Sequence, residues 1–148
     1  MTATPRIVAA VRSAVQPRIR AIVPACELRF VRNGSELVRA LNEAPCDLLI
    51  VETHFNESAA AAALSYARAR EETFPVVCVR DVPFAKPPYA ALNALRAILG
   101  AAGADAFIDL HAHANDEAGN ACARAILEPL LRRTPPPPAA PGLRLSHR

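Results

Sequence analysis

Strand-like and helix-like stretches alternate five times along this chain. The strand-like stretches are short and rich in branched aliphatic residues, and they cover residues 6–11, 26–31, 47–51, 74–79 and 106–110. Apolar runs of this length are typical of strands that are buried on both faces of a parallel sheet. Helical spacing or high helix propensity covers 14–23, 36–44, 57–70, 89–101 and 116–131. The alternation predicts a three-layer α/β sandwich with helices on both faces of the sheet.

Polar and special residues mark where several of these elements begin or end. Ser13 is the expected N-cap of the first helix, with Pro17 accommodated in its first turn and Pro24 ending it. Asn33-Gly34-Ser35 has the composition of a turn before the second helix. The fourth helix is expected to end at Gly103.

The chain is long enough for one domain. Its 148 residues are 52% hydrophobic and 21% charged, which provides ample apolar surface for a core. We assign residues 1–133 to the domain and residues 134–148, which contain four consecutive prolines, to a disordered tail. Neither a bilayer-length apolar segment nor a signal peptide is evident, so we expect a cytoplasmic protein with no membrane association.

The basic excess is small, and it consists almost entirely of arginine. The net charge is +3, and sixteen of the seventeen basic residues are arginines scattered along the chain. A nucleic-acid-binding protein would concentrate them on one face, so nucleic acid is an improbable partner, although an arginine-dependent regulator remains an alternative. The four cysteines lack a C-x-x-C pair and lie in apolar runs, which predicts buried, reduced thiols and no metal or other cofactor.

Two segments resemble a known family beyond the order of elements. The segment VRNGSELVRALNEAPCDLLIVE, residues 31–52, resembles the second strand, second helix and third strand of response-regulator receiver domains. The segment GADAFIDL, residues 103–110, is similar to the family's approach to its fifth strand, and FPVVCV stands at the fourth. The resemblance implies a flavodoxin-like fold with a five-stranded parallel sheet in the order 2-1-3-4-5.

The resemblance also implies five functional positions, and the sequence departs from the family at each. Receivers carry a phosphoacceptor aspartate, a magnesium-binding acidic pair, a hydroxyl residue and a lysine; the corresponding residues here are Glu52, the pair Val11 and Arg12, Arg80, and Leu110. Valine cannot bind magnesium, arginine repels it, and glutamate displaces the carboxylate by one methylene. We therefore expect a degenerate pseudo-receiver that is not an enzyme and acts independently of phosphorylation.

The substituted residues suggest a site of their own. The resemblance implies that one end of the sheet brings together Glu52, Arg12 and Arg80. A carboxylate and guanidiniums placed in this way form charge-assisted hydrogen bonds. Such a pair would fix the arrangement that phosphorylation switches in active receivers. The sequence leaves open whether Glu52 pairs with Arg12 or with Arg80, and whether these side chains are instead solvated independently.

A second motif supports an alternative from another class of protein. Asp109, His111 and His113 form a D-x-H-x-H pattern after the fifth strand, which resembles the metal-binding motif of amidohydrolases and related phosphoesterases. His54 lies two residues after Glu52, near the same end of the sheet. The alternative is thus a small metal- or ligand-binding enzyme, although those folds need more ligands than this chain supplies.

The resemblance finally implies an interaction face. In receivers, partners and dimer mates dock on the fourth helix, fifth strand and fifth helix, which here carry Tyr89, Arg96 and Arg124. We expect the leucines of the fourth helix to be core residues. The predicted function is a receiver-like regulatory module in two-component-type signalling that binds a signalling or transcription protein, with a homodimer possible.

Overall fold

The computed structural model describes residues 3–53, 59–70, 74–81 and 89–132. Within these ranges, parallel strands pair in the order β2-β1-β3-β4-β5, which confirms the predicted flavodoxin-like topology. The predicted tail, residues 134–148, lies outside the described residues. The strands are β1 (Arg6–Ala10), β2 (Glu27–Val31), β3 (Leu48–Glu52), β4 (Val76–Arg80) and β5 (Ala106–Asp109), and the helices are α1 (Gln16–Ile22), α2 (Gly34–Glu43), α3 (Ala59–Ala69), α4 (Tyr89–Ala101) and α5 (Glu117–Leu131).

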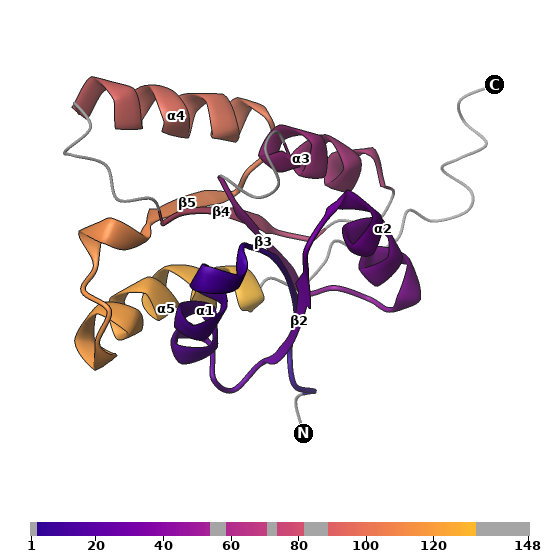
Figure 1. Cartoon of the computed structure of the whole chain (residues 1–148), viewed down its shortest axis with the longest axis horizontal. Helices are drawn as coiled ribbons and strands as arrows, with labels where there is room; N and C mark the ends of the chain where they lie inside the picture. The colour runs from indigo at the N-terminus through magenta and orange to yellow at the C-terminus, as the bar shows by residue number, and fades with distance from the viewer. Residues whose placement is uncertain (1–2, 54–58, 71–73, 82–88, 133–148) are drawn as a thin grey trace.

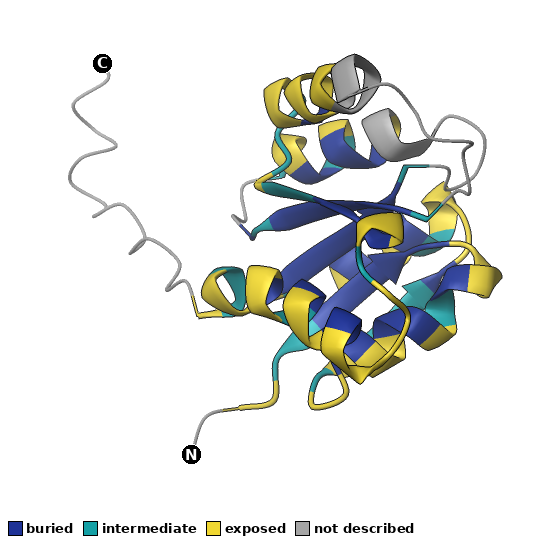
Figure 2. Ribbon diagram, turned by 90° about the vertical axis from the view of Figure 1, so that its left-hand side faces the viewer, coloured by how far each residue is buried: buried dark blue, intermediate teal, exposed yellow. Residues whose placement is uncertain are grey.

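The sheet separates two helical layers, each with its own apolar core. Helices α1 and α5 cover one face, and α2, α3 and α4 cover the other (Figure 1). Every residue of β3 and β4 is buried, as the apolar runs predict for central strands of a parallel sheet. Figure 2 shows this buried layer crossing the middle of the molecule, with exposed residues on the outer sides of the helices.

Side-chain caps determine where two helices begin. Asn33 is the N-cap of α2, because its side chain accepts a hydrogen bond from the Glu36 backbone N–H at 2.9 Å. The Glu36 carboxylate in turn accepts from the Arg32 backbone N–H at 2.7 Å. These reciprocal bonds satisfy backbone donors at the helix start, so Gly34 and Ser35 belong to α2, and the turn predicted over residues 33–35 is wrong. Asp116 caps α5 in the same way, accepting from the Gly119 backbone N–H at 2.8 Å.

The first helix begins later than its sequence signal predicts. Ser13 is not an N-cap; it opens a short 3₁₀ turn, η1 (Ser13–Val15), that precedes α1. Pro17 explains the shift, because proline lacks an N–H and fits only the first turn of a helix. The position of Pro17, and not the capping preference of Ser13, thus determines where α1 begins.

The four cysteines differ in environment. All are free thiols: Cys78 is buried in β4, Cys26 and Cys46 are half-buried, and Cys122 is exposed on α5. The prediction that all four thiols are buried is therefore wrong for Cys122. Its exposure follows from helical geometry, because the next residue, Ala123, is the one that faces the core.

Thiol labelling is expected to separate these cysteines. Burial raises the pKa of the Cys78 thiol to about 11, so at pH 8 this thiol is both neutral and inaccessible. Cys122 should accept iodoacetamide first in the native protein, and Cys78 last. Mass spectrometry of peptides over a time course measures the order, with a denatured sample, in which all four react, as the control. Labelling of native Cys78 as fast as Cys122 would contradict the buried position of β4.

No helix in the described ranges is both long and apolar enough to cross a bilayer.

Candidate functional site

The carboxyl ends of four strands bring charged side chains together at one edge of the sheet. Glu52, Arg80 and Asp109 are the last residues of β3, β4 and β5, and Arg12 follows β1 by two positions. Because all of these strands run in parallel, their ends meet at the edge where flavodoxin-like folds bind ligands. The register places Arg80 directly opposite Asp109.

Glu52 is buried and forms an ion pair with Arg12, whose side chain is exposed. The Glu52 side chain is fully buried, with Oε1 accepting a hydrogen bond from the Arg12 backbone N–H at 2.7 Å. Its Oε2 accepts from Arg12 Nε at 2.6 Å and lies 2.5 Å from a terminal guanidinium nitrogen. The hydrogen bond with Glu52 raises the pKa of the Arg12 guanidinium above its usual value. Both carboxylate oxygens are therefore occupied by one residue of the same chain.

Arg80 pairs with Asp109, so of the two pairings left open for Glu52 the structure has the one with Arg12. One terminal guanidinium nitrogen of Arg80 lies 2.9 Å from each Asp109 carboxylate oxygen, and both side chains are buried. The alternation of side chains along a strand explains this choice of partner. Glu52 shares its side of the sheet with Ile50, in the core under α1 and α5, whereas Arg80 shares its side with Cys78, in the core under α2, α3 and α4.

Asp81 and His111 connect the two ion pairs. The Asp81 backbone carbonyl accepts a hydrogen bond from Arg12 at 3.2 Å, and its carboxylate lies 3.4 Å from His111 Nε2. The His111 backbone N–H donates to Asp109 Oδ1 at 3.1 Å. A continuous set of contacts thus joins the ends of β1, β3, β4 and β5.

The two apolar residues predicted for the pocket are core residues. Val11 is 1% exposed and Leu110 is fully buried, and both pack in the cluster under α1 and α5. Leu110 opens a 3₁₀ turn, η2 (Leu110–Ala112), directly after β5. At the end of β5 the charged group of the site is Asp109, which the sequence analysis considered only as a metal ligand. Its place near the end of the predicted strand 106–110 was the available signal.

The charged residues of this site do not fit magnesium. A hard divalent cation binds carboxylate oxygens that are free to coordinate it. Here the oxygens of Glu52 are bound by Arg12, and those of Asp109 by Arg80. In the part of the chain that the structure describes, no group of three His, Cys, Asp or Glu side chains could hold a metal ion. His54 lies outside the described residues.

A buried arginine that the sequence analysis missed positions the turn after β5. Arg18 of α1 is 8% exposed, and its guanidinium donates to the backbone carbonyls of Leu110 at 2.7 Å and His113 at 2.5 Å. It also donates to the Asn120 side-chain oxygen on α5, at 3.3 Å. These bonds hold His113 by its backbone and fix the segment that carries His111.

The residues expected on the interaction face lie in different environments. Arg96 is exposed on α4 and stacks on the Phe107 ring at 5.4 Å from its centroid. Arg124 of α5 lies against α1, where its Nε donates to the Ile22 carbonyl at 2.6 Å and its side chain is 28% exposed. Leu99 is a core residue as expected. The side chains of Tyr89, Leu92 and Leu95 lie outside the described residues.

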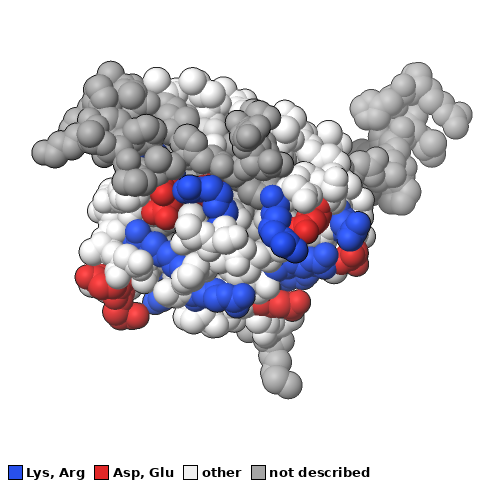
Figure 3. Space-filling model, in the orientation of Figure 1, with Lys and Arg blue, Asp and Glu red and all other residues white. Residues whose placement is uncertain are grey.

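Charge on the surface is mixed. Figure 3 shows basic and acidic side chains interleaved across the face it presents, without a continuous basic patch among the described residues there. Pairs such as Arg29 with Glu43 and Arg32 with Glu36 account for part of this pattern. On this face the interleaved charges do not form the single basic surface that is typical of nucleic-acid binding.

Solved structures with a similar fold include several response regulators. No family model and no curated protein matches the chain by sequence. A response regulator from Hahella chejuensis has a TM-score of 0.66 at 17% identity, covering 88% of this chain and 97% of that one. The receiver domain of a sensor histidine kinase from Pseudomonas aeruginosa, with a magnesium ion in its active-site cleft, has a TM-score of 0.66 at 17% identity, covering 88% of this chain and 100% of that one. An orphan response regulator from H. pylori has a TM-score of 0.62 at 17% identity, covering 86% and 97%. The chain therefore has the fold of response-regulator receiver domains.

Proposed function

We propose that this chain is a receiver-like regulatory module that acts by protein–protein interaction and does not depend on phosphorylation. The observation that carries this proposal is the ion pair between Arg12 and the buried Glu52 carboxylate at the carboxyl edge of the sheet. The similar structures are signalling proteins, which supports a role in two-component-type signal transduction. We place the module in the cytoplasm, without enzymatic activity.

The chemistry of phosphoryl transfer supports independence from phosphorylation. The reaction needs a metal that neutralises charge on the transferred group and an acceptor oxygen aligned for in-line attack. The similar domain from Pseudomonas aeruginosa holds magnesium in its cleft. In this chain the Arg12 guanidinium binds the Glu52 carboxylate instead, so the acceptor is already hydrogen-bonded and its oxygens are not free to bind a metal. The Arg12 guanidinium permanently neutralises the charge of the carboxylate at the acceptor position, where phosphoryl transfer would need a metal to neutralise charge.

The site fixes one arrangement of the strand ends, and another surface then recognises the partner. The contacts from Glu52 through Arg12 and Asp81 to Asp109 join segments that follow different strands. A module held in this way presents one constant surface. The exposed side of α4, including Arg96, is where we place the contact with a signalling or transcription protein.

Treatment with a small phosphodonor is expected to leave the mass of the protein unchanged. The protein is incubated with acetyl phosphate and magnesium and examined by intact mass spectrometry. The magnesium-binding receiver domain from Pseudomonas aeruginosa serves as the positive control. A phosphoryl adduct on Glu52 would overturn the proposal, whereas an unmodified chain beside a modified control supports it.

The same samples test the alternative of a metal-dependent enzyme. The described residues contain no cluster that would hold zinc. Thermal unfolding should therefore be the same with and without zinc. A large zinc-dependent rise in the unfolding temperature, lost on replacing His111 with alanine, would favour the metal-binding alternative.

A further inference from the structure

One arginine ties the turn after α4 to α3. Arg68, near the end of α3, donates from its guanidinium to the Gly103 carbonyl and to Asp105 Oδ2, each at 2.7 Å. A further bond, at 3.1 Å, runs to the Phe74 carbonyl, two residues before β4. Figure 1 shows the end of α4 beside α3. A single side chain therefore joins the end of α3, the segment that leads into β4, and the turn between α4 and β5.

The backbone of this turn fits the arginine closely. Gly103 has a φ of +109°, which glycine adopts without strain. A Cβ added there would lie 2.7 Å from Arg68 Cγ, so the arginine occupies the space that a side chain would need. The Asp105 carboxylate is held as well, because its Oδ2 accepts the Val76 backbone N–H at 2.8 Å. Arg68 thus binds acceptors whose positions the backbone fixes.

The described side chains of α4 bury little apolar surface. Among them Leu99 is the only buried one, at 6% exposure. Arg96 adds the contact with the Phe107 ring of β5. In β3 and β4, by contrast, every residue is buried. Segments with few buried apolar contacts open at a lower free-energy cost than the core of a domain, so the contact at the end of α4 has a large share in keeping this helix in place.

We propose that α4 opens as a unit separate from the central strands, and that Arg68 is the positioning residue that keeps it closed. Opening breaks the Arg68 bonds to the turn at Gly103, while β3 and β4 stay paired. The role of this closure in recognition rests on the proposed function, because the partner surface on α4 is complete only in the closed position. The opening itself is measured without a partner. A phosphoryl adduct on Glu52 would therefore overturn the proposed function and leave this inference standing.

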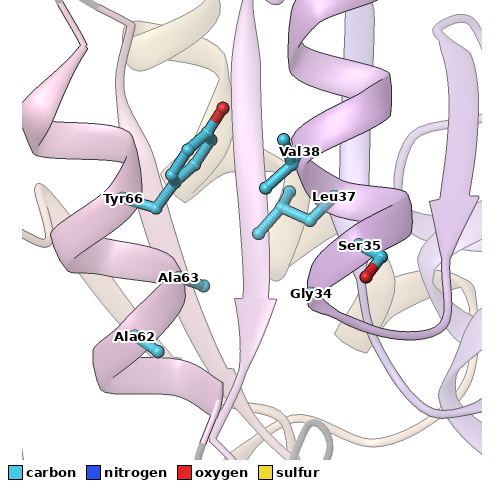
Figure 4. Close-up of a pocket in the computed structure, with 7 residues that line it drawn as sticks. All are labelled: Gly34, Ser35, Leu37, Val38, Ala62, Ala63 and Tyr66. Carbon is cyan, nitrogen blue, oxygen red and sulfur yellow. The ribbon is translucent and has the colours of Figure 1, made fainter.

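Arg70 is a matched control on the other side of α3. Its guanidinium donates to Asn42 Oδ1 at 2.6 Å and to the Leu41 carbonyl at 3.1 Å, both on α2, and to the Tyr66 hydroxyl at 3.2 Å. Tyr66 lines an apolar pocket between α2 and α3, with its ring turned toward α2 (Figure 4). Arg70 thus ties α3 to α2, and the opening of α4 leaves these bonds intact.

Amide hydrogen exchange resolved by NMR tests the proposal. A substitution speeds the exchange of an amide only where the opening that exposes it also breaks the contact that was removed. The Ala102 and Ala104 amides donate to carbonyls of α4 at 3.0 Å. Arg68→Met should speed their exchange by about tenfold or more, the factor for one hydrogen bond to a charged group. Arg70→Met should leave both amides unchanged, although it speeds the exchange of β3 by lowering the stability of the whole domain.

A conservative variant keeps the comparison possible if the methionine variant fails to fold. Arg68→Lys retains the positive charge beside Asp105 but lacks the planar fork of donors, so it should speed exchange at the end of α4, by less than Arg68→Met. Equal effects of the Arg68 and Arg70 substitutions on the Ala102 and Ala104 amides would overturn the proposal, because α4 would then open only together with the whole domain. Unchanged exchange of these amides in both Arg68 variants would overturn it as well.

Discussion

Replacing Arg12 with methionine is expected to lower the free energy of unfolding by about 3 kcal/mol, the lower end of the range for breaking a buried ion pair. The variant leaves the fully buried Glu52 carboxylate without its guanidinium partner. The cost stays at the lower end because the backbone N–H of residue 12 still donates to Glu52 Oε1, and the native Arg12 side chain is 43% exposed to water. Urea unfolding followed by circular dichroism measures the loss.

The pH dependence of the free energy of unfolding of Arg12→Met tests whether the unpaired Glu52 carboxylate causes the loss. A buried, uncompensated carboxylate favours binding a proton in the folded state, so the deficit relative to wild type should shrink as the pH falls. The double variant Arg12→Met/Glu52→Gln should recover much of the loss, because neither partner is then charged. Arg32→Met, which removes an exposed pair with Glu36, is the matched control and should cost no more than about 0.5 kcal/mol. A loss in Arg12→Met no larger than in this control would show that the pair does not stabilise the fold.

The architecture could be predicted from sequence because each central strand is a continuous apolar run. In β3, four aliphatic residues in succession, Leu48 to Val51, fit only a strand that is covered on both faces. The predicted boundaries of this strand and of β4 fall within one or two residues of those observed. Strand order came from the family resemblance, since the apolar pattern alone does not specify which strands are neighbours.

The sequence could predict which residues belong to the charged site better than it could predict which of them form ion pairs with one another. The resemblance placed Arg12, Glu52 and Arg80 at strand ends, and all three are there. Which carboxylate binds Arg80 depends on the side of the sheet that each residue faces, and that in turn depends on register and on the exact residue where each strand ends. A difference of one residue separates Arg80, opposite Asp109, from Val79, opposite Glu52. Sequence patterns do not resolve boundaries this finely.

The arginines of α1 and α5 were beyond sequence reasoning for a different reason. Their partners are mostly backbone carbonyls, which every residue carries and no pattern marks. Arg18 of α1 binds carbonyls before α5, and Arg124 of α5 binds carbonyls at the end of α1. Each of the two helices, α1 and α5, therefore carries an arginine that binds backbone carbonyls at or next to the other. Several arginines of the described residues thus have structural partners, so the basic excess by itself does not indicate a function.

These contacts separate the molecule into two functional surfaces. The carboxyl edge of the sheet and the α1–α5 side are held by ion pairs and guanidinium–carbonyl bonds. The outer side of the α2–α3–α4 layer instead carries the exposed Ile98 of α4 and an apolar pocket between α2 and α3. In the proposed module the first surface fixes the fold in one state, and the second is available for association.

Replacing Arg18 with methionine is expected to lower the free energy of unfolding by about 2–3 kcal/mol, because buried carbonyls lose their donors. The methionine stem keeps most of the packing of the arginine side chain, so the loss reports on the hydrogen bonds. The His113 carbonyl and the Asn120 side-chain oxygen lose the guanidinium that binds them. Chemical denaturation gives the magnitude, and amide hydrogen exchange should show faster opening of the segment between β5 and α5.

Arg124→Met is the matched control for this prediction. It removes the same type of side chain from the same helix pair, but Arg124 is 28% exposed, so water can replace the guanidinium at the carbonyls of Ala21 and Ile22. Its expected cost is about 1 kcal/mol or less. If the two variants were equally stable, the burial of Arg18 would not explain how much its hydrogen bonds stabilise the fold. A larger loss in Arg18→Met with protection lost first around His111 would show that this one guanidinium positions the histidine end of the charged site.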